Sequence, residues 1–336
     1  MTGKERVLAM IRGEATDRLP LMPITMMFAA DHAGVPYGRY AADGAVLAEA
    51  QLRIAEEFGF DHVSAISDPA REVSDLGGAI EWFDDQPPAI RGDAPLLDEK
   101  GKLAGLALPD PEAPGRMYDR LRGVRHLAER AGASLMIEGW VEGPCAMAAD
   151  LRGMTALMLD FADDPQFVDD LMDFAVRMEV RFAAAQVDAG ATLMGIGDAA
   201  ASLVGPRIYQ QFVLAWEQRL VEQIHALGVP VRLHICGNTK RIVRGMGETN
   251  CEIVDLDYLT PLCEARAAMG ANQVLLGNLD PVRTLRDGTP ESVYAALTEC
   301  HAQAGPRYIV AAGCETARGT PTENVRAMAR YAADHN

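Results

Sequence analysis

Three side chains with the chemistry of metal ligands stand near the ends of two short apolar runs. His234 and Cys236 lie at the end of one run, Val231–Cys236, and Cys314 follows the other, Ile309–Gly313. Each run stops at a Gly and a polar turn, as a buried parallel strand does where it passes into the loop before a helix. If both runs are strands of one barrel, an imidazole and two thiols meet at one rim. Three N/S ligands with an open fourth position describe a catalytic zinc site.

The spacing of these residues is not specific by itself, because two side chains two residues apart in a strand always share a face. The alternative interpretation is a histidine and two cysteines buried in the core. If the site binds zinc, the chemistry it permits is thiol activation. A thiol that binds the zinc at the fourth position is deprotonated by the metal and becomes a nucleophile at neutral pH.

Composition excludes several classes of function. The chain has 336 residues, and 48 acidic residues against 31 basic ones give a formal net charge of −17. Such a field repels nucleic acid and anionic membrane surfaces. No apolar stretch reaches the roughly 18 residues that a membrane span needs, and the charged N-terminus does not resemble a signal peptide. Six cysteines are too sparse for a disulfide scaffold, so we expect a cytoplasmic protein with reduced thiols.

Strand-like apolar runs alternate with helical patterns along the whole chain, which predicts one (β/α)₈ TIM barrel, an α/β fold, over residues 1–336. A doubly wound sheet also alternates in this way, but the count of eight strands favours the barrel. An amphipathic segment, Lys4–Gly13, predicts an N-terminal helical extension, and Ala79–Leu108 predicts a β-hairpin excursion after strand two. The predicted strands are Leu21–Thr25, His62–Ile66, Ser134–Glu138, Thr192–Ile196, Val231–His234, Glu252–Leu256, Gln273–Leu276 and Tyr308–Ala312.

Polar residues follow nearly every predicted strand, and active sites in this fold lie at the carboxyl ends of the strands. Carboxylates there are candidates for a fourth zinc ligand or for orienting the ligating histidine, and Asp198 and Glu138 are the candidate catalytic residues. Other side chains are candidates for binding the small substrate. The further carboxylates are Glu142 and Asp257, the candidates for a polar tail are Tyr258 and Asn278, and the candidates for an apolar wall are Met26, Met27 and Phe28.

Several motifs resemble the uroporphyrinogen decarboxylase superfamily, and within it the zinc-dependent branch of cobamide methyltransferases that act on coenzyme M. The specific ones are His234-Ile235-Cys236-Gly237-Asn238 and Gly313-Cys314-Glu315 with the following Thr320–Asn324; Gly277–Pro281 and Gly197–Ser202 are shared more widely.

This resemblance implies a (β/α)₈ barrel in which His234, Cys236 and Cys314 bind Zn²⁺. It also implies transfer of a methyl group between a methylcobamide and a small zinc-activated acceptor or donor, for which a thiol is the expected chemistry. No corrinoid-binding D-x-H-x-x-G pattern occurs in the chain. The resemblance therefore implies that the corrinoid arrives on a partner protein.

Two alternatives remain. The decarboxylase branch carries an Arg-rich stretch after the first strand, whereas Leu21–Ala30 contains no Arg or Lys. Asp68 aligns with the aspartate that holds the pyrrole nitrogens in decarboxylases, but it fits both branches and also counts as a candidate substrate-binding residue. The other alternative is a non-catalytic barrel that binds a small molecule or a partner.

Overall fold

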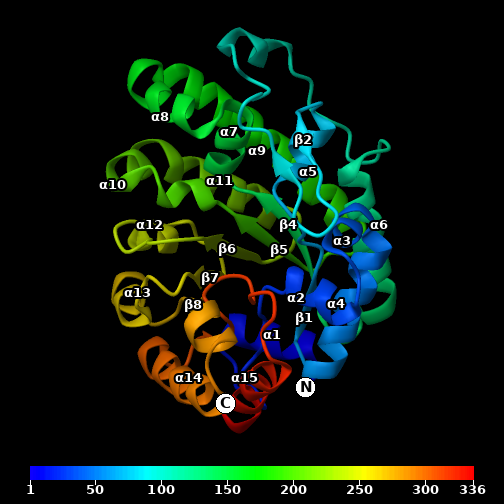
Figure 1. Ribbon diagram of the computed structural model, residues 1–336. Helices are drawn as coiled ribbons and strands as arrows, with labels where there is room; N and C mark the ends of the chain where they lie inside the picture. Colours follow the sequence, from blue (N-terminus) through cyan, green and yellow to red (C-terminus); the bar gives the residue numbers. More distant parts are fainter.

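A curved sheet of seven parallel strands forms the centre of the molecule, which we describe from a computed structural model of residues 1–336. Neighbouring strands in the sheet follow one another in the order β1, β4, β5, β6, β7, β8 and β9 (Figure 1). The bounds are β1 His62–Ser64, β4 Met136–Glu142, β5 Leu193–Gly197, β6 Val231–Ile235, β7 Ile253–Leu256, β8 Val274–Leu276 and β9 Tyr308–Ile309. This arrangement confirms the predicted (β/α)₈ barrel.

The eighth position of the barrel is held by the segment around Leu21, between β9 and β1. Leu21 forms a parallel bridge with Val310, and its carbonyl accepts a hydrogen bond of 3.0 Å from the backbone N–H of Asp61. The predicted strand Leu21–Thr25 is therefore wrong as a regular strand, although the segment closes the barrel. Pro20 and Pro23 flank this contact, and a proline has no N–H to donate to a ladder.

Helices connect the strands and surround the sheet (Figure 1). Their starts follow sequence signals: Asp43 caps α4 by accepting a hydrogen bond from Ala45 N, and α9 and α14 begin at Pro165 and Pro290. The helices are α1 Gly3–Arg12, α2 Met27–Ala33, α3 Tyr37–Ala42, α4 Gly44–Phe58, α5 Ala70–Asp75, α6 Arg116–Ala131, α7 Pro144–Arg152, α8 Met154–Asp163, α9 Pro165–Asp188, α10 Gly205–Ile208, α11 Leu214–His225, α12 Val243–Glu248, α13 Leu262–Met269, α14 Pro290–Ala304 and α15 Thr322–Asp334. Short 3₁₀ turns span η1 Lys100–Gly105 and η2 Ala199–Ser202, and π-helical turns span η3 Tyr209–Val213 and η4 Pro281–Arg286. None of the helices is both long enough and apolar enough to span a lipid bilayer.

The N-terminal extension and the hairpin excursion are both present. Helix α1 precedes the barrel, and β2 (Ile80–Glu81) pairs antiparallel with β3 (Ala89–Ile90) after β1. The hairpin reaches back to the barrel through Trp82, whose ring centroid lies 4.8 Å from the guanidinium of Arg116. Trp82 is 48% exposed, so the hairpin presents an aromatic side chain at the molecular surface.

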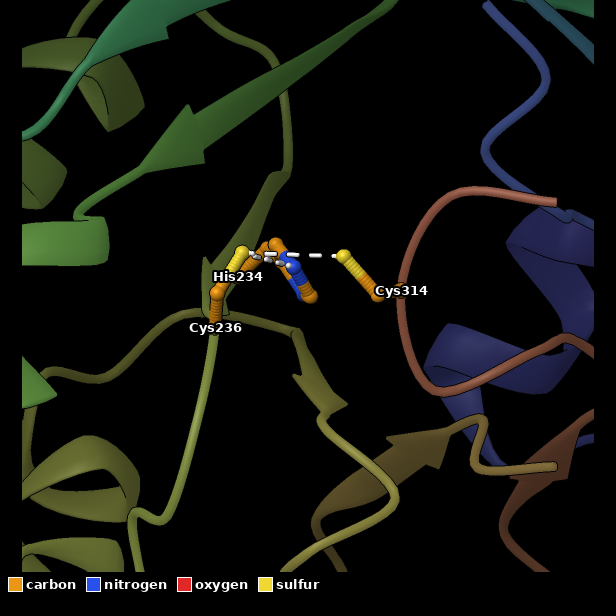
Figure 2. A group of neighbouring side chains, drawn as sticks. All are labelled: His234, Cys236 and Cys314. Carbon is orange, nitrogen blue, oxygen red and sulfur yellow. Dashed lines mark hydrogen bonds between the residues drawn. The ribbon is translucent and has the colours of Figure 1, made fainter. Parts of the chain in front are cut away.

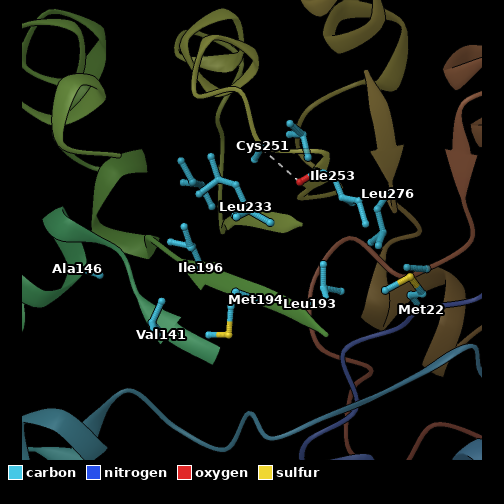
Figure 3. Packing of buried hydrophobic residues seen from close by; sticks show 14 of the residues in the cluster. Met22, Val141, Ala146, Leu193, Met194, Ile196, Leu233, Cys251, Ile253 and Leu276 are labelled. Carbon is cyan, nitrogen blue, oxygen red and sulfur yellow. Dashed lines mark hydrogen bonds between the residues drawn. The ribbon is translucent and has the colours of Figure 1, made fainter. Parts of the chain in front are cut away.

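The apolar core lies between the strands and the surrounding helices. Figure 3 shows Leu193, Ile196, Leu233, Ile253 and Leu276 among these buried side chains, all contributed by central strands. Because side chains alternate along a strand, Ile196 and Leu233 face the surrounding helices, whereas Leu193, Ile253 and Leu276 share the inward face of their strands with Arg232 and His234. The barrel interior therefore holds both apolar side chains and these two polar ones.

Candidate metal centre and its cavity

Two segments of the barrel mouth, which follow strands that are not neighbours in the sheet, bring the three predicted ligands together. His234 lies in β6, Cys236 begins the loop after it, and Cys314 lies in the loop after β9 (Figure 2). His234 Nε2 is 3.0 Å from Cys236 Sγ, and the two Sγ atoms are 3.7 Å apart. The three ligand atoms all lie within 4.8 Å of one another, so one ion could contact all three. The expected convergence of these side chains is confirmed.

The Asp255 carboxylate faces the Nδ1 atom of the His234 ring. Asp255 is the direct neighbour of His234 in the β6–β7 register, and its Oδ2 lies 3.1 Å from His234 Nδ1. Arg232 approaches the same oxygen at 2.7 Å through Nη2. Burial alone would raise the pKa of Asp255, but Arg232 and His234 hold it below its usual value. Since the carboxylate occupies the Nδ1 side, Nε2 is left facing the two thiols.

The two thiols differ in proton affinity. The hydrogen bond with Cys236 and the nearby His234 lower the pKa of Cys314 to about 4, although burial opposes them. The same hydrogen bond, together with burial, raises the pKa of Cys236. Burial would lower the pKa of His234, yet Asp255 and Cys236 raise it well above the usual histidine value. An imidazole with two thiols is a donor set that suits zinc.

A cavity of about 170 Å³ opens above these three side chains. Trp140 and Ile66 pack together with Ile24 into a small apolar cluster, and Met26 lies against it, so one wall is apolar. The predicted apolar role of Met26 fits its place in this wall. The cavity is lined by Ile24, Met26, Ile66, Asp68, Pro69, Trp140, Glu142, Gly197, Ala199, His234, Cys236, Cys314 and Glu315.

Two of the predicted carboxylates line this cavity. Both oxygens of Asp68 lie 2.7 Å from the guanidinium of Arg116, which lowers the pKa of the carboxyl despite its burial. Glu142 lies 3.3 Å from Arg71 Nη2, but burial raises the pKa of this carboxyl well above its usual value. The candidate substrate-binding residue Asp68 is thus at the cavity, as is Glu142.

Glu138 does not reach the mouth, because the strand predicted to end there continues to Glu142 as β4. Its Oε1 lies 3.2 Å from Arg232 Nη1 and its Oε2 lies 3.6 Å from His62 Nε2, both within the barrel. Asp198 is fully buried and accepts hydrogen bonds from the backbone N–H groups of Cys145 (3.2 Å) and Ala146 (2.6 Å). Burial raises the pKa of Asp198 to about 6. Neither candidate catalytic carboxylate lines the cavity.

The remaining candidates support the loops that carry the ligands. Asp257 accepts a 2.8 Å hydrogen bond from the N–H of Gly237, directly after Cys236. Asn278 donates from Nδ2 to the carbonyls of Asp257 (3.0 Å) and Thr260 (2.7 Å). The Tyr258 side chain is 42% exposed and does not line the cavity. Its backbone packs so closely on Gly313 that a Cβ there would lie 2.4 Å from Tyr258 N, so the residue before Cys314 must be glycine.

The sequence interpretation assigned no role to three residues that the structure places at the candidate centre or its cavity: Asp255, Glu315 and Trp140. Asp255 interrupts the apolar run Ile253–Leu256 just as Arg232 interrupts Val231–Ile235. Charged residues of opposite sign inside two strand patterns were the signal that could have revealed the pair, since buried charges need partners. Glu315 carried no such signal, because a carboxylate in a loop is usually solvated.

Comparison with known proteins agrees with the fold and with the family resemblance. The family profile described as uroporphyrinogen decarboxylase (URO-D) matches residues 2–335. The chain is 29% identical to the methylcobamide:CoM methyltransferase MtbA of Methanosarcina mazei, covering 99% of this chain and 98% of that protein. It is 27% identical to the uroporphyrinogen decarboxylase of Gloeobacter violaceus, over 83% of this chain and 80% of that one.

Among solved structures, a methyltransferase from Methanosarcina mazei superposes with a TM-score of 0.90 at 25% identity, covering 99% of both chains. The similarity to methylcobamide:CoM methyltransferases therefore spans the barrel from end to end and includes the whole mouth. The expected resemblance is confirmed: the chain belongs to the uroporphyrinogen decarboxylase (URO-D) family.

Proposed function

We propose that this protein is a zinc-dependent corrinoid methyltransferase that moves a methyl group between a corrinoid protein and a small thiol. The observation that carries the proposal is the convergence of His234, Cys236 and Cys314 beneath an apolar cavity. The similarity to a methylcobamide:CoM methyltransferase over 99% of the chain supports it. Coenzyme M is a thiol, which agrees with the chemistry expected of this donor set.

In this proposal each ligand has a distinct supporting residue. Asp255 holds His234 with Nε2 toward the thiols, and the N–H of Gly237 is held by Asp257, which fixes the loop of Cys236. Zinc, when bound, keeps a substrate thiol deprotonated and nucleophilic at neutral pH. The apolar wall excludes water from the sulfur, so that the thiolate is not stabilised by hydration before it reacts.

Methyl transfer between the corrinoid and the thiol needs no additional oxidant or reductant. For transfer toward the thiol, the thiolate sulfur forms the new C–S bond while the Co–C bond breaks. The electron pair of that bond stays on cobalt, which is reduced from Co(III) to Co(I), and the thiol proton goes to solvent. Asp198 and Glu138, which the sequence suggested as catalytic, have positioning roles in this proposal: Asp198 holds the start of α7, and Glu138 holds Arg232.

A decarboxylase of porphyrinogens is the weaker candidate, because its substrate carries several carboxylates that must be neutralised on binding. No Lys or Arg lines the cavity, and the nearest guanidinium groups, Arg71 and Arg116, are engaged with carboxylates. The third possibility is a binding protein without catalysis. An assay of methyl transfer distinguishes it from the proposed methyltransferase.

The corrinoid would be delivered by a partner protein, and one surface beside the mouth suits an acidic partner. Arg207 follows β5, and Lys240, Arg241 and Arg244 follow β6; these four exposed cations line one hollow of about 640 Å³, which we call the basic hollow. None of the four forms an ion pair, although the chain has a net charge of −17. Opposite charge across an interface speeds and orients association. We also propose a cytoplasmic location, where the six free cysteines stay reduced.

Metal analysis of the purified protein tests the centre. We expect about one zinc per chain, lost in Cys236→Ala and Cys314→Ala but retained in Cys263→Ala, which removes an exposed cysteine elsewhere. Methylcobalamin with a panel of thiols then tests transfer, followed through the spectral change on demethylation. If both ligand variants retained all of their zinc, the assignment of Cys236 and Cys314 as zinc ligands would be wrong. Zinc-loaded protein that transfers no methyl group in either direction, even with its own corrinoid protein, would favour the binding-protein alternative.

A further inference from the structure

The cavity above the metal centre contains no cationic side chain. Thirteen residues line it, and none is Lys or Arg. Its charged or ionisable lining consists of the carboxyl groups Asp68, Glu142 and Glu315 beside the three ligands. The remainder of the lining is apolar or glycine and includes Trp140 and Ile66.

The cations closest to the cavity are already paired with carboxylates. Arg71 lies 3.3 Å from both Glu72 and Glu142, and Arg116 lies 2.7 Å from Asp68. Beyond Glu315, the Arg318 guanidinium lies 2.5 Å from Asp31 and 2.8 Å from Asp85. None of these three guanidinium groups is therefore free to receive a second anion.

An anionic group on a small substrate would thus be desolvated in the cavity without a partner. A buried charge is tolerated only when it is paired and hydrogen-bonded. With a volume of about 170 Å³, the cavity leaves a substrate bound at the metal centre little room to place a charged tail far from the lining. Carboxyl oxygens, by contrast, accept hydrogen bonds. Glu142 uses Oε1 toward Arg71, and Glu315 uses Oε1 toward the N–H of Met27, which leaves the second oxygen of each carboxyl for a ligand.

We infer that the small substrate carries no anionic group: it is a thiol, or its S-methyl form, with a short uncharged or cationic tail. The inference rests on the proposed function and narrows its substrate class. The inferred substrate differs from coenzyme M, the thiol in the name of the relative MtbA, because coenzyme M is 2-mercaptoethanesulfonate and ends in an anionic sulfonate. Trp140 and Glu142 lie two residues apart on β4 and face the cavity together, so the same strand provides the apolar wall and the acceptor.

Three thiols that differ only in their terminal group test the inference: 2-mercaptoethanol, cysteamine and 2-mercaptoethanesulfonate. Each is given to the zinc-loaded protein with methylcobalamin, and binding of each is measured separately by calorimetry. We expect kcat/KM for the sulfonate to be at least about tenfold below that for the better of the other two, and its binding to be weaker by a similar factor.

A designed cation should remove this discrimination. Met26 lines the cavity and is only partly buried, so Met26→Lys places an ammonium at the mouth, whereas Met27→Lys places it on the neighbouring residue, which does not line the cavity. We expect Met26→Lys to raise the sulfonate's kcat/KM relative to 2-mercaptoethanol at least about threefold, and Met27→Lys to leave the order of the three thiols unchanged.

The outcomes separate the inference from the proposed function. Methyl transfer to the sulfonate that equals or exceeds transfer to the other two overturns the inference and leaves the methyltransferase proposal intact. Absence of transfer to all three contradicts the methyltransferase proposal, and the calorimetric order then decides the inference. Tighter or equal binding of the sulfonate overturns it, and weaker binding supports it.

Discussion

Replacing Asp255 with asparagine should weaken zinc binding without removing any ligand. The Asp255 carboxylate is fully buried, lies 3.1 Å from His234 Nδ1 and also holds Arg232. Asparagine keeps the shape of the side chain but removes its charge, so His234 loses both its orienting partner and a negative charge near the metal. Residues in this position commonly contribute about 10–100-fold to metal affinity. We therefore expect a loss of about 1.4–2.7 kcal/mol in zinc binding.

The matched control is Glu138→Gln. Glu138 is as deeply buried as Asp255 and also pairs with Arg232, at 3.2 Å, but it forms no ion pair with His234. Breaking a buried pair costs about 3–5 kcal/mol of folding stability. Both variants should therefore unfold at lower urea concentration than the parent, whereas only Asp255→Asn should also release zinc more readily.

The assay is competition for zinc with a chromophoric chelator at pH 8, with folding checked by circular dichroism. A high pH limits competition between protons and zinc for the imidazole, so the affinity difference reports the contact with Asp255. Equal zinc affinities for Asp255→Asn and Glu138→Gln would refute the reasoning. In that case the 3.1 Å contact would contribute to stability alone.

Three further predictions follow from separate parts of the molecule. Burial raises the pKa of Asp198 to about 6 in the folded protein. The contribution of this group to stability is therefore complete below the unfolded pKa of about 3.9 and is lost as the pH rises through 6. The urea midpoints at pH 4 and pH 7 should differ less in Asp198→Asn than in the parent protein, and an unchanged difference would contradict this assignment. Reversing the charge of the basic hollow with Lys240→Glu and Arg241→Glu should slow methyl transfer from the corrinoid protein, most strongly at low salt. Transfer from free methylcobalamin should be unaffected. Equal slowing with both methyl sources would show that the hollow does not contact the partner. Uroporphyrinogen should be decarboxylated negligibly, because no Lys or Arg lines the cavity, and formation of coproporphyrinogen at ordinary enzyme rates would reverse the choice of function.

Much of this architecture was accessible from the sequence, because strand periodicity and ligand chemistry are local signals. The run Val231–Ile235 and the residue Cys314 were placed at the mouth from their patterns alone, and the structure brings their ligands within 4.8 Å. Helix α14 begins at Pro290, and a proline in the first turn of a helix is likewise a local signal. These signals need no knowledge of which strands become neighbours.

The errors arose where the outcome depends on distant contacts. Leu21–Thr25 has a strand-like composition, but its prolines limit it to a single bridge with Val310. Glu138 was expected at the mouth because the predicted strand Ser134–Glu138 ended there, yet β4 continues to Glu142 by pairing with β5. Asp255 was missed because its importance comes from the neighbouring strand, where it meets His234.

Closure of the barrel through Leu21 has a consequence for how the protein is made. The Leu21 segment bonds on one side to Asp61 and on the other to Val310, so the ring joins the beginning of the chain to its end. A chain emerging from the ribosome cannot complete this ring until nearly all of it has been synthesised. Cys314 lies 78 residues beyond Cys236 and only four beyond Val310, so the third metal ligand arrives with the closing contact. If the centre binds a metal, its three ligands come together only once the segment that closes the barrel is in place.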